Sequence, residues 1–124
     1  MVSGLKLFDL NGKTALITGS SQGIGYALAK GLADAGSDII LNGRNIEKLK
    51  KSAESLNTKQ KIFQLCFDVT DYKQTKQSIN EFERENKPID ILINNAGMQF
   101  RTPLEDFPPE KFELLLKTNV SSVF

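Results

Sequence analysis

Thr18-Gly19-Ser20-Ser21-Gln22-Gly23-Ile24-Gly25 stands between an apolar run and an alanine-rich run. The run before it, Thr14 to Ile17, is short and apolar, which is typical of a buried strand. The run after it, Tyr26 to Ala35, has the composition of a helix. Glycines in such a turn let the backbone approach a ligand closely, and the free N–H groups of the helix favour a phosphate. This context favours a phosphate-binding turn over a turn whose glycines serve only packing.

The rest of the chain alternates between short apolar segments and longer amphipathic ones, after a lead-in at residues 1–13. The patterns predict strands at residues 14–17, 38–42, 61–67 and 89–93, and helices at 23–35, 45–56, about 70–86 and from about 109. The last strand is nearly all apolar, as expected for a strand covered on both faces. This alternation indicates an α/β fold with a parallel sheet, one half of a doubly wound architecture.

Two details of the helices follow from residue type. Ile24, Leu28 and Leu32 recur at four-residue spacing and predict the buried stripe of the first helix. Thr70 suits the N-cap of the third helix because its hydroxyl can accept a hydrogen bond from a free backbone N–H group.

The composition is that of one soluble globular domain. The 124 residues include 16 Lys and Arg against 15 acidic residues, so nothing indicates a nucleic-acid or membrane-surface partner. No apolar run approaches membrane-spanning length, and the single cysteine, Cys66, cannot form an internal disulfide; we therefore expect a cytoplasmic location. Histidine is absent, which removes His-based triads and most zinc sites, and we expect no metal site.

Polar residues follow each predicted strand, at the edge of the sheet where open parallel folds bind ligands. After the second strand comes Asn42-Gly43-Arg44, with a guanidinium and no carboxylate, which suits the 2′-phosphate of NADP better than the free ribose of NAD. The alternative is a solvated Arg at a helix start. Asp68-Val69-Thr70 follows the third strand, and its carboxylate could bind an adenine amino group or serve the next helix. Asn94-Asn95-Ala96-Gly97 follows the fourth strand, where its amides could tie loops together and its small residues could leave space for a flat ligand; the alternative is an ordinary turn.

In combination, Thr-Gly-x-x-x-Gly-Ile-Gly, Asp-Val-Thr and Asn-Asn-Ala-Gly resemble the short-chain dehydrogenase/reductase family over essentially the whole chain. The resemblance implies NAD(P)H-linked chemistry between an alcohol and a carbonyl, on a Rossmann-type sheet with strand order 3-2-1-4. It implies that Asp68 and Val69 border the adenine. The other residues that it assigns to the cofactor are Gly19, Ser21, Gln22, Gly23, Ile24, Gly25, Arg44, Asn95, Ala96 and Gly97.

Two further residues gain roles from the resemblance. Asn119 falls within an apolar stripe of the last helix, formed by Phe112, Leu115, Leu116, Val120 and Val123, where we expect a buried amide. It matches the family's catalytic Asn, which helps to hold a water in the proton relay; the alternative is an amide bonded to nearby backbone. The segment from Gly97 to Pro108, with Leu41 to Arg44, resembles the gluconate 5-dehydrogenases and related sugar-acid dehydrogenases. Arg101 could then pair with a substrate carboxylate.

The family's Ser after a fifth strand, and the Tyr-x-x-x-Lys pair on the helix that follows it, have no counterpart in this sequence. Tyr26 and Tyr72 are each followed by a Lys four residues later, but both lie in early helices. The resemblance therefore corresponds to an N-terminal half, a dinucleotide-binding domain over residues 1–124. One hypothesis is an NADP-dependent oxidoreductase of a sugar acid such as gluconate, with a 3-oxoacyl thioester as the alternative substrate. The other is a catalytically inactive nucleotide-binding or interaction module. The family suggests a homo-oligomer, and we expect residues 1–124 alone to be inactive and to self-associate through the exposed fourth strand.

Overall fold

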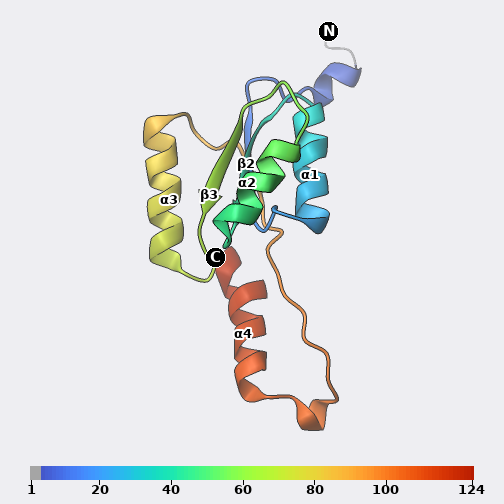
Figure 1. Cartoon of the computed structure of the whole chain (residues 1–124), viewed down its shortest axis with the longest axis vertical. Helices are drawn as coiled ribbons and strands as arrows, with labels where there is room; N and C mark the ends of the chain where they lie inside the picture. Colours follow the sequence, from blue (N-terminus) through green and yellow to red (C-terminus); the bar gives the residue numbers. More distant parts are fainter. Residues whose placement is uncertain (1–3) are drawn as a thin grey trace.

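The computed structural model describes residues 4–124 (Figure 1). Residues 1–3, the start of the predicted lead-in, lie outside the described residues. Four parallel strands form one sheet in the order β3-β2-β1-β4, as predicted. The strands are β1 (Thr14–Ile17), β2 (Asp38–Gly43), β3 (Ile62–Cys66) and β4 (Ile91–Ile93). The α-helices are α1 (Gly23–Asp34), α2 (Ile46–Ser55), α3 (Tyr72–Glu85) and α4 (Pro109–Asn119), and the 3-10 helices are η1 (Gly4–Phe8), η2 (Leu104–Asp106) and η3 (Ser121–Val123).

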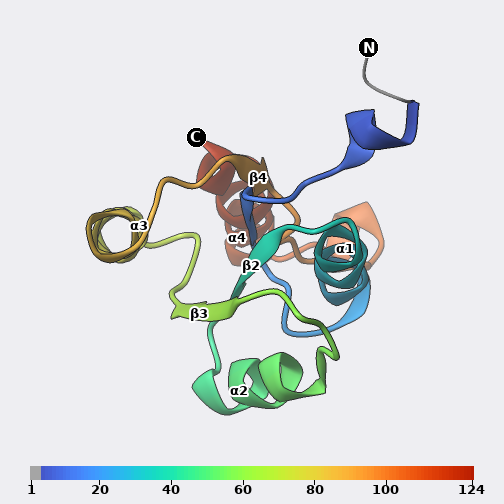
Figure 2. The same ribbon diagram turned by 90° about the horizontal axis from the view of Figure 1, so that it is seen from above.

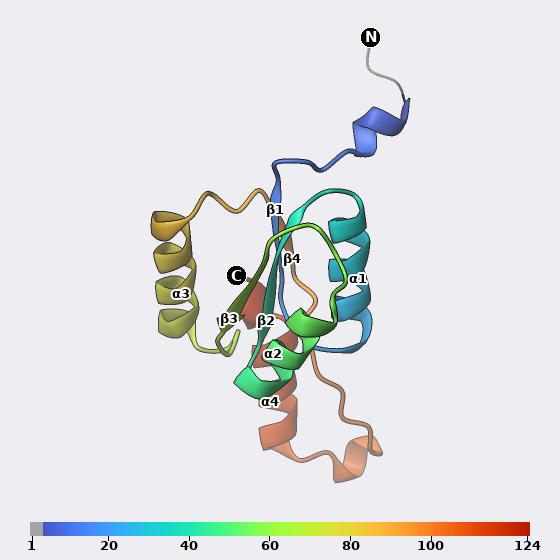
Figure 3. The ribbon, with the colours of Figure 1, turned by 45° about the horizontal axis from the view of Figure 1, so that its top comes forward.

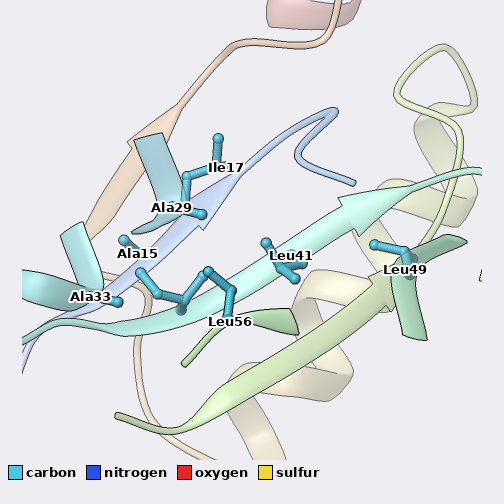
Figure 4. Close-up of a cluster of buried hydrophobic side chains, with 8 residues drawn as sticks. Ala15, Ile17, Ala29, Ala33, Leu41, Leu49 and Leu56 are labelled. Atoms are coloured by element: carbon cyan, nitrogen blue, oxygen red, sulfur yellow. The ribbon is translucent and has the colours of Figure 1, made fainter. Parts of the chain in front are cut away.

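Helices cover both faces of the sheet because both faces of its central strands are apolar. Helices α1 and α2 lie on one face and α3 on the other (Figure 2). Alternate residues of β1 divide between the two layers: Ala15 and Ile17 pack toward α1, whereas Leu16 packs toward Phe82 of α3. Figure 4 shows the larger cluster, in which Leu49 of α2 also takes part. Complete burial of β1 accounts for its sequence, in which Thr14 is followed by three apolar residues.

The buried face of α1 differs from the predicted one. Ile24 is 75% exposed and Leu28 is also exposed, whereas the buried residues of the helix are Gly25, Ala29 and Ala33. Small residues on this face let the helix backbone lie close to β1, so the larger side chains one position earlier turn outward. The predicted stripe is therefore wrong by one residue, and of its three members only Leu32 packs against the core.

Two expectations about α3 and β4 are also corrected. The N-cap of α3 is Asp71, whose carboxylate accepts the Gln74 N–H at 3.0 Å, while the Thr70 hydroxyl donates to Asp68 instead. Strand β4 is shorter than predicted, and Leu92 is 55% exposed rather than covered. Strand β4 lies at the edge of the sheet, and α3 packs over Leu16 and Ile40 of the neighbouring strands.

Helix α4 extends beyond the carboxyl edge of the sheet (Figures 1 and 3). None of its residues is buried, so the predicted apolar stripe is largely exposed, with Phe112 at 55% and Leu116 at 45%. Asn119 is exposed as well, which corrects the expectation of a buried amide. The reason is that the helix projects away from the sheet instead of packing across it. Within residues 4–124, no helix has both the length and the apolar character needed to cross a membrane.

Candidate functional site: a cleft at the carboxyl edge of the sheet

A cleft of about 500 Å³ opens where the carboxyl ends of the four strands meet. It contains every predicted cofactor residue except Ile24 and Gly25, which lie just beyond it in the first turn of α1. The predicted residues that line it are Gly19, Ser21, Gln22, Gly23, Arg44, Asp68, Val69, Asn95, Ala96 and Gly97. Residues as far apart in the chain as Gly19 and Gly97 thus meet in one place, because parallel strands bring their ends to the same edge.

The glycine turn presents the start of α1 to this cleft. Gly19 and Gly23 have φ of 61° and 63°, a conformation that glycine adopts without strain. Gln22 is the N-cap of α1, yet its side chain accepts no capping hydrogen bond, whereas Asn45 caps α2 and Asp71 caps α3. The first turn of α1 also has no acidic residue. The N–H groups at the start of α1 therefore remain able to bind an anion.

Close packing holds the turn against the loop that follows β4. Thr18 Oγ1 accepts hydrogen bonds from the backbone N–H groups of Asn95 and Ala96, both at 3.0 Å. The amide of Asn95 donates in return to the carbonyls of Thr18 and Gly19, also at 3.0 Å. A Cβ at Gly25 would lie 2.5 Å from Asn95 Nδ2 and from the Gly19 carbonyl oxygen. Gly25 is thus required for packing within the site, which explains its presence without any ligand contact.

Charged groups of both signs lie near each other where Arg44 and Asp68 line the cleft. Asp68 Oδ1 accepts hydrogen bonds from the N–H and the hydroxyl of Thr70, at 2.9 and 2.7 Å. Partial burial alone would raise the pKa of Asp68, but these bonds and the charges of Arg44 and Lys117 hold that pKa below its ordinary value. Asp68 is therefore ionised near neutral pH. Since Asp71 caps α3, the Asp68 carboxylate does not serve as the helix cap.

Asn119 connects α4 to the loop after β4. Its Oδ1 accepts the Met98 N–H at 2.8 Å, and its Nδ2 donates to the Met98 carbonyl at 2.9 Å. The helix changes form at this point, because the Val123 N–H donates to the Val120 carbonyl rather than to that of Asn119, as a continuing α-helix would require. The side chain of Asn119 is thus hydrogen-bonded to the loop backbone, whereas its backbone carbonyl does not accept the hydrogen bond that a continuing α-helix would give it.

Arg101 does not join the other predicted site residues. It is exposed and lies outside the cleft, in the extended segment that runs from Gly97 toward η2. Edge-to-face contacts of Phe107 with Phe100 and with Phe112, at centroid distances of 5.4 and 6.4 Å, hold this segment to α4. In the part of the chain that the structure describes, no three Cys, Asp or Glu side chains gather as a metal site would require.

The cleft is also lined by residues to which the sequence analysis assigned no role in cofactor binding. Two of these residues belong to α4, which is far in sequence from the strand ends, so the sequence did not indicate that they line the cleft. The others lie next to or within the motifs that follow the strands. They are Asn42, Gly43, Phe67, Thr70, Met98, Leu114 and Thr118. A signal existed for Asn42, since a polar residue at the end of an otherwise buried apolar strand must find hydrogen-bond partners.

Comparison with known proteins identifies the family. The sequence model described as short chain dehydrogenase matches residues 13–124. The chain belongs to the short-chain dehydrogenase family. This short-chain dehydrogenase sequence is 47% identical to gluconate 5-dehydrogenase of Gluconobacter oxydans, over 95% of this chain and 46% of that protein. It is 41% identical to 2-dehydro-3-deoxy-D-gluconate 5-dehydrogenase of Bacillus subtilis, over 94% and 46% of the two chains.

Solved structures of the short-chain dehydrogenase family share the fold described above. The gluconate 5-dehydrogenase from Burkholderia cenocepacia, in complex with NADP and tartrate, matches with a TM-score of 0.90 at 44% identity. The match covers 97% of this chain and 48% of that one. The chain thus spans about half the length of the relatives it matches.

Proposed function

We propose that residues 1–124 form the NADP-binding Rossmann-type domain of a short-chain dehydrogenase that interconverts a sugar acid such as gluconate and its keto form. The observation that carries the proposal is the start of α1, which has no side-chain cap and no acidic residue and opens into a cleft of about 500 Å³. Such a helix start binds a pyrophosphate. Family membership and the sugar-acid relatives support the reaction class.

The residues present fit NADP at both ends of the cleft. Gly19 and Gly23 let the backbone approach the pyrophosphate, and Arg44 offers paired donors to the 2′-phosphate. No Asp or Glu occurs between Leu41 and Asn45 to repel that phosphate or to favour NAD. Asp68 and Val69 border the adenine, and Asn95, Ala96 and Gly97 lie on the ribose side. The bound cofactor would supply the hydride acceptor or donor, and these residues would bind and orient it.

Asn119 and Arg101 complete the proposed site. The side chain of Asn119 fixes the loop after β4, and its released carbonyl is available to hold a water of the proton relay. An amide does not titrate near neutral pH, so Asn119 cannot itself supply the proton. Arg101 would pair with the substrate carboxylate. The two Tyr-x-x-x-Lys sequences of residues 1–124 begin at Tyr26 in α1 and Tyr72 in α3, and neither lines the cleft. We therefore propose that residues 1–124 bind cofactor without catalysing turnover. The proposal includes a cytoplasmic protein that forms homo-oligomers.

The cofactor proposal is tested by fluorescence titration with NADPH, which is simple because the chain has no tryptophan. Replacing Arg44 with alanine should weaken NADPH binding by about 1.5–3 kcal/mol, roughly 10–150-fold, as expected for a lost charged hydrogen bond. Binding of NADH should hardly change. Arg84→Ala removes the same charge from α3, outside the cleft, and should leave both affinities unchanged. Equal losses for the two cofactors in Arg44→Ala would refute the 2′-phosphate assignment.

The substrate proposal needs a turnover assay. Residues 1–124, and the same chain extended by the C-terminal half of a gluconate 5-dehydrogenase, are incubated with gluconate and NADP, with 5-ketogluconate and NADPH, and with a 3-oxoacyl thioester and NADPH. We expect turnover of the sugar acid by the extended chain only. Preference for the thioester would overturn the proposed substrate class. Turnover by residues 1–124 alone would overturn the proposal that they bind the cofactor without catalysing the reaction.

A further inference from the structure

Asn42 is a buried amide at the base of the cleft, and its side chain joins two of the cleft's walls. The residue is 1% exposed. Its Oδ1 accepts the backbone N–H of Gly19 at 3.0 Å, and its Nδ2 donates to the carbonyls of Leu65 and Phe67 at 3.0 and 3.2 Å. One side chain thus bonds the glycine turn after β1 and the end of β3.

The backbone of Asn42 strengthens the same connection. Its N–H donates to Ser20 Oγ at 3.0 Å, and its carbonyl accepts the Ser20 N–H at 2.8 Å. The Ser20 hydroxyl in turn donates to the carbonyl of Ile17. Since these groups are buried, a broken bond would leave a polar group without water or another partner, so the arrangement resists distortion.

The two segments that Asn42 joins belong to different halves of the proposed cofactor site. Gly19 begins the turn that leads to α1, on the pyrophosphate side. Phe67 immediately precedes Asp68 and Val69, on the adenosine side. A dinucleotide must engage both halves at once, so its affinity depends on the spacing between them.

We propose that Asn42 is a positioning residue for the cofactor, which holds the glycine turn and the end of β3 at the spacing that NADP spans. The proposal rests on the proposed function. Asn42 acts through Gly19 and Phe67, because its own donors and acceptor are already occupied. Its role is therefore distinct from that of Arg44, which would contact the cofactor.

The first test compares ligands that span one or both halves of the cleft, by isothermal titration calorimetry well below the unfolding midpoint of each variant. Asn42→Ala should weaken NADP binding about tenfold or more, as for a lost buried hydrogen bond. It should weaken binding of adenosine 2′-monophosphate, which occupies only the adenosine side, by less than about twofold. Asn45→Ala is the matched control, because the Asn45 side chain caps α2 by accepting the Lys48 N–H and, among residues 4–124, forms no hydrogen bond with the turn or with β3. It should preserve both affinities.

The second test uses Asn42→Asp, which keeps the acceptor for Gly19 and replaces only the donor to β3. A protonated carboxyl group can donate to one of the two β3 carbonyls, whereas a carboxylate is repelled by both. Burial raises the pKa of the introduced carboxyl group, which brings its titration toward neutral pH. The ratio of variant to wild-type NADP affinity should therefore fall as the pH rises from 5.5 to 8. Taking this ratio cancels the titration of the cofactor phosphate, and the readout remains valid if Asn42→Ala does not fold.

The outcomes separate this inference from the proposed function. Failure of the wild-type chain to bind NADP overturns the proposed function and this inference with it. Wild-type binding together with equal losses of NADP and adenosine 2′-monophosphate in Asn42→Ala, or no loss of either, overturns the inference alone. A ratio for Asn42→Asp that does not change with pH also overturns it.

Discussion

Replacing Gly19 with alanine should destabilise the protein through two separable effects. The first is conformational, since Gly19 has φ of +61°, and a left-handed conformation costs an L-residue about 1–2 kcal/mol. The second is steric, because the added Cβ would lie 2.9 Å from the Cα of Ala96 and 3.2 Å from its Cβ. Carbon atoms pack best at roughly 3.5–4.0 Å. Ala96 is held by its hydrogen bond to Thr18, so it cannot move away without breaking that bond.

The steric effect destabilises the folded state by a further amount of about 1–3 kcal/mol. Alanine also lowers the conformational entropy of the unfolded chain, which offsets about 0.4–1 kcal/mol of this loss. We therefore expect Gly19→Ala to lower the free energy of unfolding by about 1–4.5 kcal/mol. Urea unfolding followed by circular dichroism measures it. The free energy of unfolding of a natural domain is about 5–15 kcal/mol, so the variant should still fold.

Two matched variants separate the effects. Gly12 has φ of +82° and nothing within 4 Å of an added Cβ, so Gly12→Ala should show only the conformational loss of about 1 kcal/mol. Gly31 lies exposed in the interior of α1 with open space around it, so Gly31→Ala should stabilise the protein by about 0.5–1 kcal/mol. A loss for Gly19→Ala no larger than that for Gly12→Ala would refute the contact between Gly19 and Ala96.

Three further predictions concern other parts of the fold. Among residues 4–124, Thr14 Oγ1 is a buried hydroxyl without a hydrogen-bond partner, so Thr14→Val should raise the free energy of unfolding by up to about 1 kcal/mol; a loss above about 1 kcal/mol would show that the hydroxyl has a partner. Partial burial raises the pKa of Asp38, but Lys87, at 2.8 Å, and the Lys61 N–H lower that pKa below its ordinary value. The stabilisation from the lowered pKa is complete above about pH 4 and is lost as the pH falls through the lower pKa of the folded state. In urea titrations below about pH 4, the free energy of unfolding should therefore decline less for Asp38→Asn than for the wild type. Finally, residues 1–124 should self-associate at micromolar concentration through Leu92 and α4, and Leu92→Lys should reduce this; a wild-type monomer in size-exclusion chromatography with light scattering would contradict it.

Local sequence patterns were sufficient to predict the order of the elements and the position of the cleft. The strands are short runs of three to six residues, and the α-helices are amphipathic runs of ten to fourteen. Because the two kinds of run differ in period, strands can be told from helices along the chain. The glycine turn between β1 and α1 was also visible, because its residue types and its flanks lie within one short stretch. Since parallel strands end at one edge, the motifs that follow β1 to β4 had to meet there.

Tertiary structure alone decided which side chains each element turns toward its neighbours. Hydrophobicity favoured Ile24 and Leu28 for the buried face of α1, but close approach to the sheet selected Gly25, Ala29 and Ala33. Helix α4 has an apolar stripe, yet its direction beyond the sheet leaves Asn119 exposed. Burial depends on where an element lies relative to others, and a period along the chain does not contain that information.

The connections that shape the site also lie beyond local patterns. Asn42 meets Gly19 and Phe67 across 23 and 25 positions, and Asn119 meets Met98 across 21. The sequence determined that Asn42 is an amide at the end of an apolar strand, which must satisfy its polar groups. Which groups satisfy it depends on the register of β2 beside β1 and β3, and that register exists only once the sheet has formed.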